Sequence, residues 1–397
     1  MYPRVFCINL SSHLLEQVPF RRHLSRQLSI AFDLYLQIRE KVAHRVDIAL
    51  KRDSPDWRLK HACPACTYKL KDEEPLNFSM LLTCDGNDSL RRVLKRKATD
   101  EEAETLGASS ELRSIHGPHM DTRMWGGRYL SRSYVDAWAK NVVQEMMVES
   151  LDTVSNAKPC KLYQLPNHTY QNDPDYNPCV ERWKNMSDDI TRRAWAIFDE
   201  TGLFLALCRH GFALLLADMV QSGELYVFCY VTCLHATKCM HYRAKYPLAI
   251  VQKLLDTFGK DLGLGYDIGC KFKTTVRQSS LGAQARELNL TCLVGAFHGH
   301  AHNRICQLSH LATYVDGLGL EDLEGCERAF SKSNALAAAI RHASIFHRMQ
   351  AIATYFEHTD KFEVYANLSE SSLHYNMLDI DLSTLQAISF STITNRP

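Results

Sequence analysis

Two apolar runs between residues 195 and 220 constrain the fold of this chain more than any other segment. Residues 203–208 (LFLALC) are followed by His210-Gly211 and then by a second apolar run. Before them, the apolar residues 196–198 meet a predicted turn at residues 199–202 (DETG). Short apolar runs separated by turn residues are typical of buried antiparallel strands. The segment therefore predicts a hairpin within a β-sheet.

The composition permits a large core but indicates no particular partner. Hydrophobic residues make up 46% of the 397 residues, and the formal net charge is +1. A polyanion would therefore have to be held by local basic clusters. Residues 203–220 include Arg209, His210 and Asp218, which are costly to bury in a bilayer, so we expect no membrane span. The 14 cysteines are spread along the chain and no secretory signal opens it, which predicts an intracellular protein with reduced thiols.

The remaining segments predict an α/β (α+β) fold. Residues 25–50 carry apolar residues at helical spacing, and residues 77–85 form an apolar run that ends in the predicted turn Gly86-Asn87-Asp88. Further along, the patterns predict helices at 135–151, 182–195 and 248–258 (after Pro247), a strand leading into Asp267, a strand-like stretch at 288–297 and a mainly helical region at 321–356. This order matches an RNase H-like plan, a mixed sheet flanked by helices, with large mainly helical insertions.

Three acidic residues occupy distinctive places in this order. Asp85 closes the first apolar strand, Asp267 follows another, and Glu324 lies in an acidic stretch at residues 321–328. Two carboxylates at strand ends and a third on a later helix can converge on a pair of divalent metal ions, a geometry that suits phosphodiester cleavage or transfer. Taken singly, each acid has a simpler interpretation as a turn carboxylate or as part of a solvated helix face.

Several blocks of sequence resemble the Kyakuja-Dileera-Zisupton (KDZ) transposases of basidiomycete fungi. The blocks occur in the same order from about residue 56 to residue 368. They include residues 61–70 (HACPACTYKL), 84–90 (CDGNDSL), 198–202 (FDETG), 208–211 (CRHG), 217–220 (ADMV), 265–270 (GYDIGC), 297–302 (FHGHAH) and 322–331 (DLEGCERAFS).

The resemblance implies a cut-and-paste DNA transposase with an RNase H-like core and an Asp-Asp-Glu triad that binds Mg²⁺ or Mn²⁺. Carried onto this chain, Asp85 is the first acid, Asp267 the second and Glu324 the third, with Glu327 as the alternate to Glu324. The implied partner is DNA, both transposon ends and target, and the implied location is the nucleus. An oligomer is compatible with this function.

A CxxC pair, Cys63 and Cys66, predicts half of a structural zinc site, which needs two more soft ligands. The candidates are His298, His302 and Cys306, which share one face of a helix, or His298, His300 and His302, which share one side of a strand. Related transposase groups carry Cys/His metal-binding motifs near the catalytic core. The alternative is a pair of buried thiols, with the histidines lining a DNA groove.

Five regions are expected along the chain. They are an N-terminal helical region (1–60), the CxxC segment with the first catalytic strand (61–94), an insertion or linker with helices (95–194), the remainder of the core (195–356) and a divergent tail (357–397). Within the core, residues 226–243 have no counterpart in the resembling proteins, and we hypothesise that they are a retained intron. The Cys and His residues of that segment would then carry no chemistry.

A basic cluster follows the first acid and predicts contact with DNA phosphates or a nuclear import signal. It consists of Arg91, Arg92, Lys95, Arg96 and Lys97. The alternative is a solvated loop. Because the chain also lacks the upstream cysteine-rich module of the resembling proteins and diverges from them after about residue 369, we expect a truncated or degenerate copy. The competing function is a catalytically inactive nucleic-acid-binding or zinc-scaffolded protein derived from a transposase.

Overall fold

The computed structural model describes residues 21–69, 71–72, 74–93, 127–139, 197–220 and 234–369. Several predictions fall outside these residues: the insertion at 95–194 except for residues 127–139, the helix at 182–195, the first part of the segment 226–243, and the tail after residue 369. The predicted helix at 135–151 is described only through residue 139, where residues 132–139 are helical. The chain forms two compact units, Met1–His61 and Ala62–Pro397, which are considered separately.

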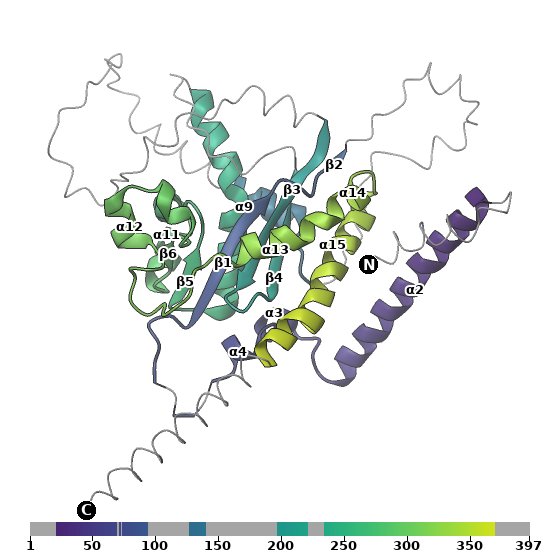
Figure 1. Ribbon diagram of the computed structural model, residues 1–397, viewed down its shortest axis with the longest axis horizontal. Coiled ribbons are helices and arrows are strands. Elements are labelled where there is room, and N and C mark those ends of the chain that lie inside the picture. The colour runs from purple at the N-terminus through teal and green to yellow at the C-terminus, as the bar shows by residue number, and fades with distance from the viewer. Residues whose placement is uncertain are drawn as a thin grey trace, which may run out of the picture. The chain divides into compact units, whose positions relative to one another are not determined.

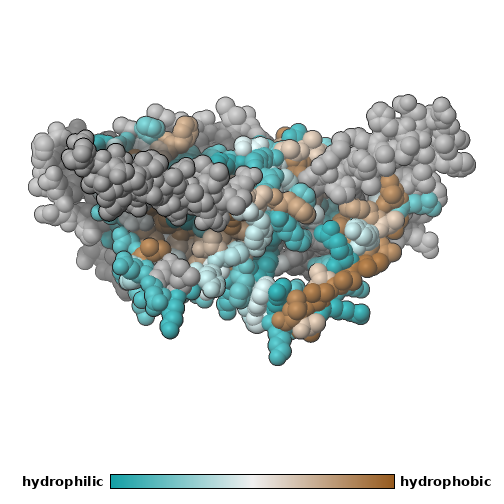
Figure 2. Space-filling view, turned by 60° about the horizontal axis from the view of Figure 1, so that its bottom comes forward, coloured by the Kyte–Doolittle hydropathy of each residue, from teal (hydrophilic) through white to brown (hydrophobic). Residues whose placement is uncertain are grey.

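The first unit contains the long helix predicted near the N-terminus. This helix, α2, spans Arg21–Ala49, and a short helix, α3, spans Trp57–Lys60. Many apolar side chains of α2 are exposed, among them Ile30, Leu34, Ile38 and Val42. Hydrophobic residues also form a visible row on the molecular surface in Figure 2. None of the helices among the described residues has the length and apolar character needed to cross a membrane.

The second unit is built on a mixed sheet of six strands (Figure 1). The strands are β1 (Met80–Asn87), β2 (Arg92–Val93), β3 (Phe198–Cys208), β4 (Ala213–Val220), β5 (Leu262–Gly265) and β6 (Thr291–Leu293). β3 pairs antiparallel with β1, β2 and β4, whereas β5 pairs parallel with β1 and β6 pairs parallel with β5. The predicted mixed sheet is therefore confirmed.

Helices flank this sheet. They are α4 (Pro64–Thr67), α9 (Leu234–Phe258), α10 (Gly269–Arg277), α11 (Gly282–Glu287), α12 (Arg304–His310), α13 (Gly325–Ser333), α14 (Ala337–Ile340) and α15 (Ile345–Thr359). α13 contacts β1 and β3 and crosses the front of the sheet in Figure 1, while α9 contacts β3 and β4. α13, which begins directly after Glu324, therefore lies against β1, the strand that contains Asp85.

The hairpin prediction was correct in its second turn and wrong in its first. The chain turns between β3 and β4 at His210-Gly211, where Gly211 has a φ of 91°, a conformation that favours glycine. The predicted turn at residues 199–202 instead lies inside β3, with an irregular register between Glu200 and Gly202. Arg92 of β2 pairs there with the carboxylates of Asp199 and Glu200, so these turn-forming residues are held in extended structure.

Three further boundaries differ from the sequence predictions. β1 continues through Gly86 and Asn87, so Asp85 lies inside the strand rather than at its end. α9 begins at Leu234 and contains Pro247, which was expected to precede the helix. Its first ten residues therefore belong to the segment 226–243, where the retained intron was hypothesised. β6 covers only three residues of the predicted strand-like stretch.

A fully buried arginine attaches α15 to the sheet. Arg348 donates through Nη2 to the carbonyl oxygens of Leu90 (2.8 Å) and Gly202 (2.9 Å), and its Nη1 pairs with Asp218. The side chain of Arg348 is 0% exposed. A buried charge is tolerated only when it is paired and hydrogen-bonded, and Arg348 meets both conditions. One side chain thus connects α15, β3, β4 and the segment after β1.

Candidate active site and metal clusters

The pairing of β1 with β5 brings the first two predicted acids to the same edge of the sheet. Thr83 of β1 pairs with Gly265 of β5 in parallel register, and Asp85 and Asp267 each follow two residues later. Paired strands lie about 4.8 Å apart, so the end of β5, which Asp267 follows, lies next to the part of β1 that carries Asp85. Asp85 is 9% exposed, so its carboxylate is largely shielded from solvent.

One small pocket collects all four predicted acids. Asp85, Asp267, Glu324 and Glu327 line it together with His298, which the sequence suggested as a zinc ligand or as part of a DNA groove. The remaining lining residues are Thr83, Cys84, Gly265, Tyr266, Gly295, Leu323 and Cys326. The structure therefore brings the acids of three distant segments to one place.

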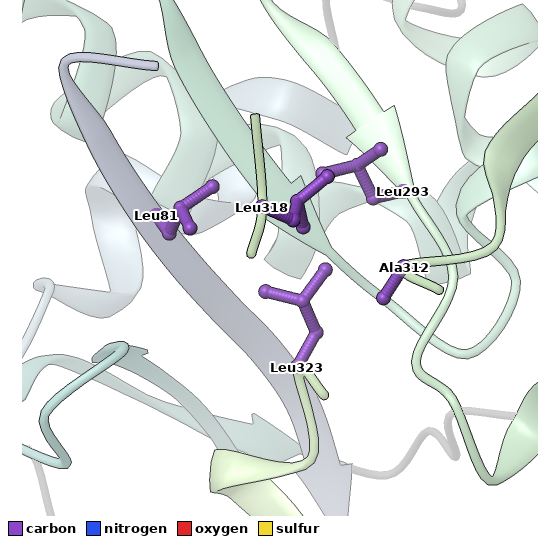
Figure 3. Packing of buried hydrophobic residues seen from close by; sticks show 5 residues of the cluster. All are labelled: Leu81, Leu293, Ala312, Leu318 and Leu323. Carbon is purple, nitrogen blue, oxygen red and sulfur yellow. The ribbon is translucent and has the colours of Figure 1, made fainter. Parts of the chain in front are cut away.

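The backbone conformation of Leu323 determines how the chain enters Glu324 and the start of α13. Leu323 has a φ of 58°, which is unfavourable for a residue with a branched side chain. Its side chain is buried in a cluster with Leu81, Leu293, Ala312 and Leu318, and Figure 3 shows these side chains gathered around it. Burial of this side chain offsets the backbone strain, and the chain then enters α13 with Glu324 at its N-terminal boundary.

Glu324 is held by hydrogen bonds from the opposite wall of the pocket. The backbone N–H of Phe297 donates to its Oε1 at 2.9 Å, and Nδ1 of His298 lies 3.2 Å from its Oε2. Gly295 makes this approach feasible, because a Cβ at that position would lie 2.2 Å from Oε1 of Glu324. The carboxylate is thus fixed in the pocket before any ligand binds.

The pair of His298 and Glu324 favours the charged form of both groups. Burial acts to raise the pKa of Glu324, but the hydrogen bond and charge of His298 and the N–H groups of residues 297 and 298 outweigh it, so this pKa is lowered. The hydrogen bond to Glu324 raises the pKa of His298 against the effect of burial, and the charges of Asp267 and Glu327 add to the rise. Glu324 is therefore predominantly a carboxylate at neutral pH.

Glu327 is less constrained than Glu324. Its Oε1 lies 3.8 Å from Nε2 of His298, and its side chain is 52% exposed, whereas that of Glu324 is 12% exposed. Between the two candidates for the third acid, the geometry favours Glu324.

The pocket offers carboxylate oxygens as candidate ligands for a cation. Mg²⁺ prefers carboxylate oxygens and retains several waters, so a few acids suffice to hold it. Among the described residues, the ligand atoms that lie within 4.8 Å of one another belong to two Cys/His clusters and not to these acids. A two-metal site is wider than that, since two ions about 3.5–4 Å apart allow outer ligands up to about 8 Å apart.

The first Cys/His cluster contains the CxxC pair. Cys63, Cys66, Cys208 and His210 have ligand atoms that all lie within 4.8 Å of one another. Hydrogen bonds from Cys208 and Cys66 lower the pKa of Cys63. Cys208 acts to lower the pKa of Cys66, but the hydrogen bond and charge of Cys63, together with burial, raise it to about 12. These residues could hold a metal such as zinc.

The second cluster lies next to Asp267. Cys270, His302 and Cys306 are all buried, and Nδ1 of His302 lies 3.5 Å from the Cys270 sulfur and 3.4 Å from the Cys306 sulfur. The other ring nitrogen, Nε2, lies 2.8 Å from the backbone carbonyl oxygen of Asp267. His302 therefore connects this cluster to the backbone of the second predicted acid.

The structure distributes the predicted zinc ligands differently from the sequence expectation. Cys63 and Cys66 meet Cys208 and His210, whereas His302 and Cys306 meet Cys270, and His298 meets Glu324. His300 is exposed and belongs to neither cluster. Sequence reasoning missed Cys208, His210 and Cys270 as partners, although the close spacing of Cys208 and His210 resembles a second half-site.

The predicted basic cluster is only partly described. Arg92 is buried and its guanidinium pairs with Asp199 and Glu200, so the expectation that it contacts DNA phosphates does not fit its environment. Arg91 is partly exposed, and its guanidinium lies over the Phe198 ring at 5.4 Å. Lys95, Arg96 and Lys97 lie outside the described residues.

Comparison with known proteins yields one match. A family model described as Kyakuja-Dileera-Zisupton transposase matches residues 78–243 and 239–360. No curated protein and no solved structure matches the chain. The matched ranges include the four pocket acids, His210 and the second Cys/His cluster, whereas Cys63 and Cys66 precede them.

Proposed function

Because the chain belongs to the Kyakuja-Dileera-Zisupton transposase family, we propose that it is a DNA transposase of the Asp-Asp-Glu type. In this proposal Asp85, Asp267 and Glu324 hold two Mg²⁺ ions, and Glu327 is the alternate third ligand. The observation that carries the proposal is the convergence of these acids on one pocket. They come from β1, from the end of β5 and from the N-terminal boundary of α13, which lie far apart in sequence.

The sheet supports an RNase H-like core for this enzyme. β3 separates β4 from β1, and β5 and β6 extend the sheet on the far side of β1. The three longest strands are antiparallel neighbours and the last two are added in parallel, the mixed arrangement that the resemblance implies. Asp85 lies on the central strand of this order.

Bound metal ions would activate the attacking oxygen and stabilise the leaving 3′ oxygen in strand cleavage and transfer. The protein's own contribution is to position the acids. The parallel register aligns Asp85 with Asp267, and the carbonyl of Asp267 is held by His302. His298 and the N–H of Phe297 orient Glu324 and keep it ionised. These contacts leave the carboxylates ready to bind cations without rearrangement of the backbone.

DNA is the partner in this proposal, and the nucleus is where the protein would meet it. An acidic pocket repels the phosphodiester backbone until cations neutralise it. Basic residues must then hold the DNA, and of the two members of the predicted basic cluster that the structure describes, Arg91 is partly exposed whereas Arg92 is buried.

A cleavage assay on the element's own terminal repeats tests this function. Full-length protein with Mg²⁺ or Mn²⁺ is expected to nick these ends, and Asp85→Ala is expected to abolish nicking while retaining DNA binding in a gel-shift assay. Glu363→Gln is the matched control, because Glu363 is a partly exposed acid outside the pocket that pairs with Lys332 at the surface. Wild-type protein that shifts the ends but never cleaves them would instead support the catalytically inactive DNA-binding alternative.

A further inference from the structure

We propose that Cys63, Cys66, Cys208 and His210 bind one structural Zn²⁺ ion that fastens the segment before β1 to the turn between β3 and β4. The proposal is independent of the catalytic function, because none of the four residues lines the acidic pocket.

The distances from His210 to the two sulfurs of the CxxC pair match those of a tetrahedral zinc site. Zinc binds sulfur at about 2.3 Å and nitrogen at about 2.0–2.1 Å, so in a tetrahedron the sulfur and nitrogen ligands lie about 3.5 Å apart. Nδ1 of His210 lies 3.4 Å from the Cys63 sulfur and 3.2 Å from the Cys66 sulfur. All four ligand atoms lie within 4.8 Å of one another, and Cys63, Cys66 and Cys208 are free thiols.

The backbone of the first half-site is already shaped around the site. Cys63 precedes α4, Pro64 occupies the first turn of that helix, and the N–H of Cys66 donates to the carbonyl oxygen of Cys63 at 3.2 Å. Thr67 adds two bonds to the same carbonyl, from its N–H at 3.1 Å and from its hydroxyl at 2.8 Å. This compact turn directs both sulfurs of the CxxC pair toward His210.

The second half-site is provided by the β3–β4 turn. Cys208 is the last residue of β3, and the N–H of Gly211 donates to its carbonyl oxygen at 2.8 Å. The N–H of Arg209, between the two ligands, donates to the carbonyl oxygen of Leu81 in β1 at 2.9 Å. The turn is thus fixed to the sheet by its own hydrogen bonds, independently of any metal.

The proposed site is structural because four protein side chains close it. A catalytic zinc keeps an open position for water, whereas a set of three cysteines and one histidine leaves none. The site also lies away from the acids. Leu205 is the β3 partner of Asp85, and Cys208 follows it by three residues, which places the two sites about 10 Å apart along the strand.

Zinc at this position would join segments that are far apart in sequence. Cys63 and His210 are separated by 147 residues. The cluster links residues 63–66 directly to the β3–β4 turn. A metal bond across so long a loop removes conformational freedom from the unfolded chain and is expected to stabilise the fold.

Metal analysis of purified full-length protein tests the assignment. We expect Cys208→Ala and His210→Ala each to lower the zinc content by one equivalent per chain relative to wild type. Cys292→Ala is the matched control, because Cys292 is a buried thiol outside both Cys/His clusters. Cys270→Ala should remove only zinc that is bound by the second Cys/His cluster, so it distinguishes that zinc from the ion proposed here. Wild-type zinc content in Cys208→Ala would overturn the proposal, as would iron in place of zinc.

A second measurement decides the question if those variants do not fold. In cobalt-substituted protein, His210→Cys replaces a nitrogen ligand by a fourth thiolate, and cysteine is itself a good zinc ligand. The variant is therefore expected to fold and to keep the metal, while its thiolate-to-cobalt absorption rises by about one third. An absorption spectrum identical to that of the wild type would show that residue 210 is not a ligand.

Discussion

Asp85 and Asp267 each lie two residues beyond Thr83 and Gly265, which are partners in the parallel pairing of β1 and β5. Both acids line one small pocket at this edge of the sheet. Like charges gathered in one pocket disfavour each other's ionised form unless a cation or a proton lies between them. The pairing of β1 with β5 thus contributes two acids to the same pocket.

Replacement of the two candidate third acids should have unequal effects. Glu324→Gln is expected to slow metal-dependent cleavage by about 10²-fold or more, because it removes the carboxylate charge that Phe297 and His298 hold in place. Glu327→Gln is expected to slow it by less than about tenfold, since Glu327 is half exposed and weakly held. Single-turnover cleavage of labelled transposon ends measures both. A larger loss of cleavage rate in Glu327→Gln than in Glu324→Gln would show that Glu327 is the third acid of the triad.

Gly295→Ala should impair catalysis through Glu324. A Cβ at position 295 would lie 2.2 Å from the Oε1 atom of Glu324, so the carboxylate must leave its present position. The expected result is a cleavage rate close to that of Glu324→Gln, with the protein still folded by circular dichroism. Gly325→Ala is the control, because the nearest side chain from another segment that its Cβ would meet is Thr83, whose hydroxyl lies at 3.1 Å. Equal rates in Gly295→Ala and wild type would show that Glu324 is not needed where it now lies.

Arg348→Met should strongly destabilise the fold. It leaves the carboxylate of Asp218 without its buried partner and removes donors from the carbonyl groups of Leu90 and Gly202. Loss of one partner of a buried ion pair costs about 3–5 kcal/mol. Lys332→Ala breaks a surface pair with Glu363 and is expected to cost less than about 1 kcal/mol. Urea unfolding of the two variants measures the contrast, and similar midpoints would contradict the role assigned to Arg348.

Lys271 predicts a rise in stability with pH. Burial lowers the pKa of this lysine from 10.5 to about 8. Between these values the folded chain has released the proton while the unfolded chain still binds it, so the free energy of unfolding increases with pH across this window. Lys271→Met should abolish that increase, which urea unfolding at about pH 7 and about pH 10 would detect.

The exposed Lys273 of the same helix provides the control for loss of a positive charge. Lys273→Met should retain the wild-type rise in stability. A rise of the same size in Lys271→Met would assign the pH dependence to other groups.

The sequence predicted several strands of the sheet and the acids of the pocket. Apolar runs located β1, β4 and β5, because a buried strand must be apolar along its length. The resemblance then selected Asp85, Asp267 and Glu324 among 45 acidic residues, and the structure places all three in one pocket.

Other features depended on contacts that no local pattern encodes. Residues 199–202 have the composition of a turn, but Arg92 holds two of their carboxylates inside a strand. Cys63 and Cys66 meet Cys208 and His210 across about 145 residues, whereas the spacing of the late histidines had suggested His298 and His302 as their partners. Pro247 was interpreted as a helix boundary, although α9 continues through it.

The position of Arg348 has a consequence for how this protein is made. The strands that need its guanidinium are complete by residue 220, but the arginine itself is synthesised more than one hundred residues later. While the ribosome is still translating the intervening segment, Asp218 and the carbonyl groups of Leu90 and Gly202 have no such donor. The sheet can therefore reach its final packing only after α15 has emerged from the exit tunnel.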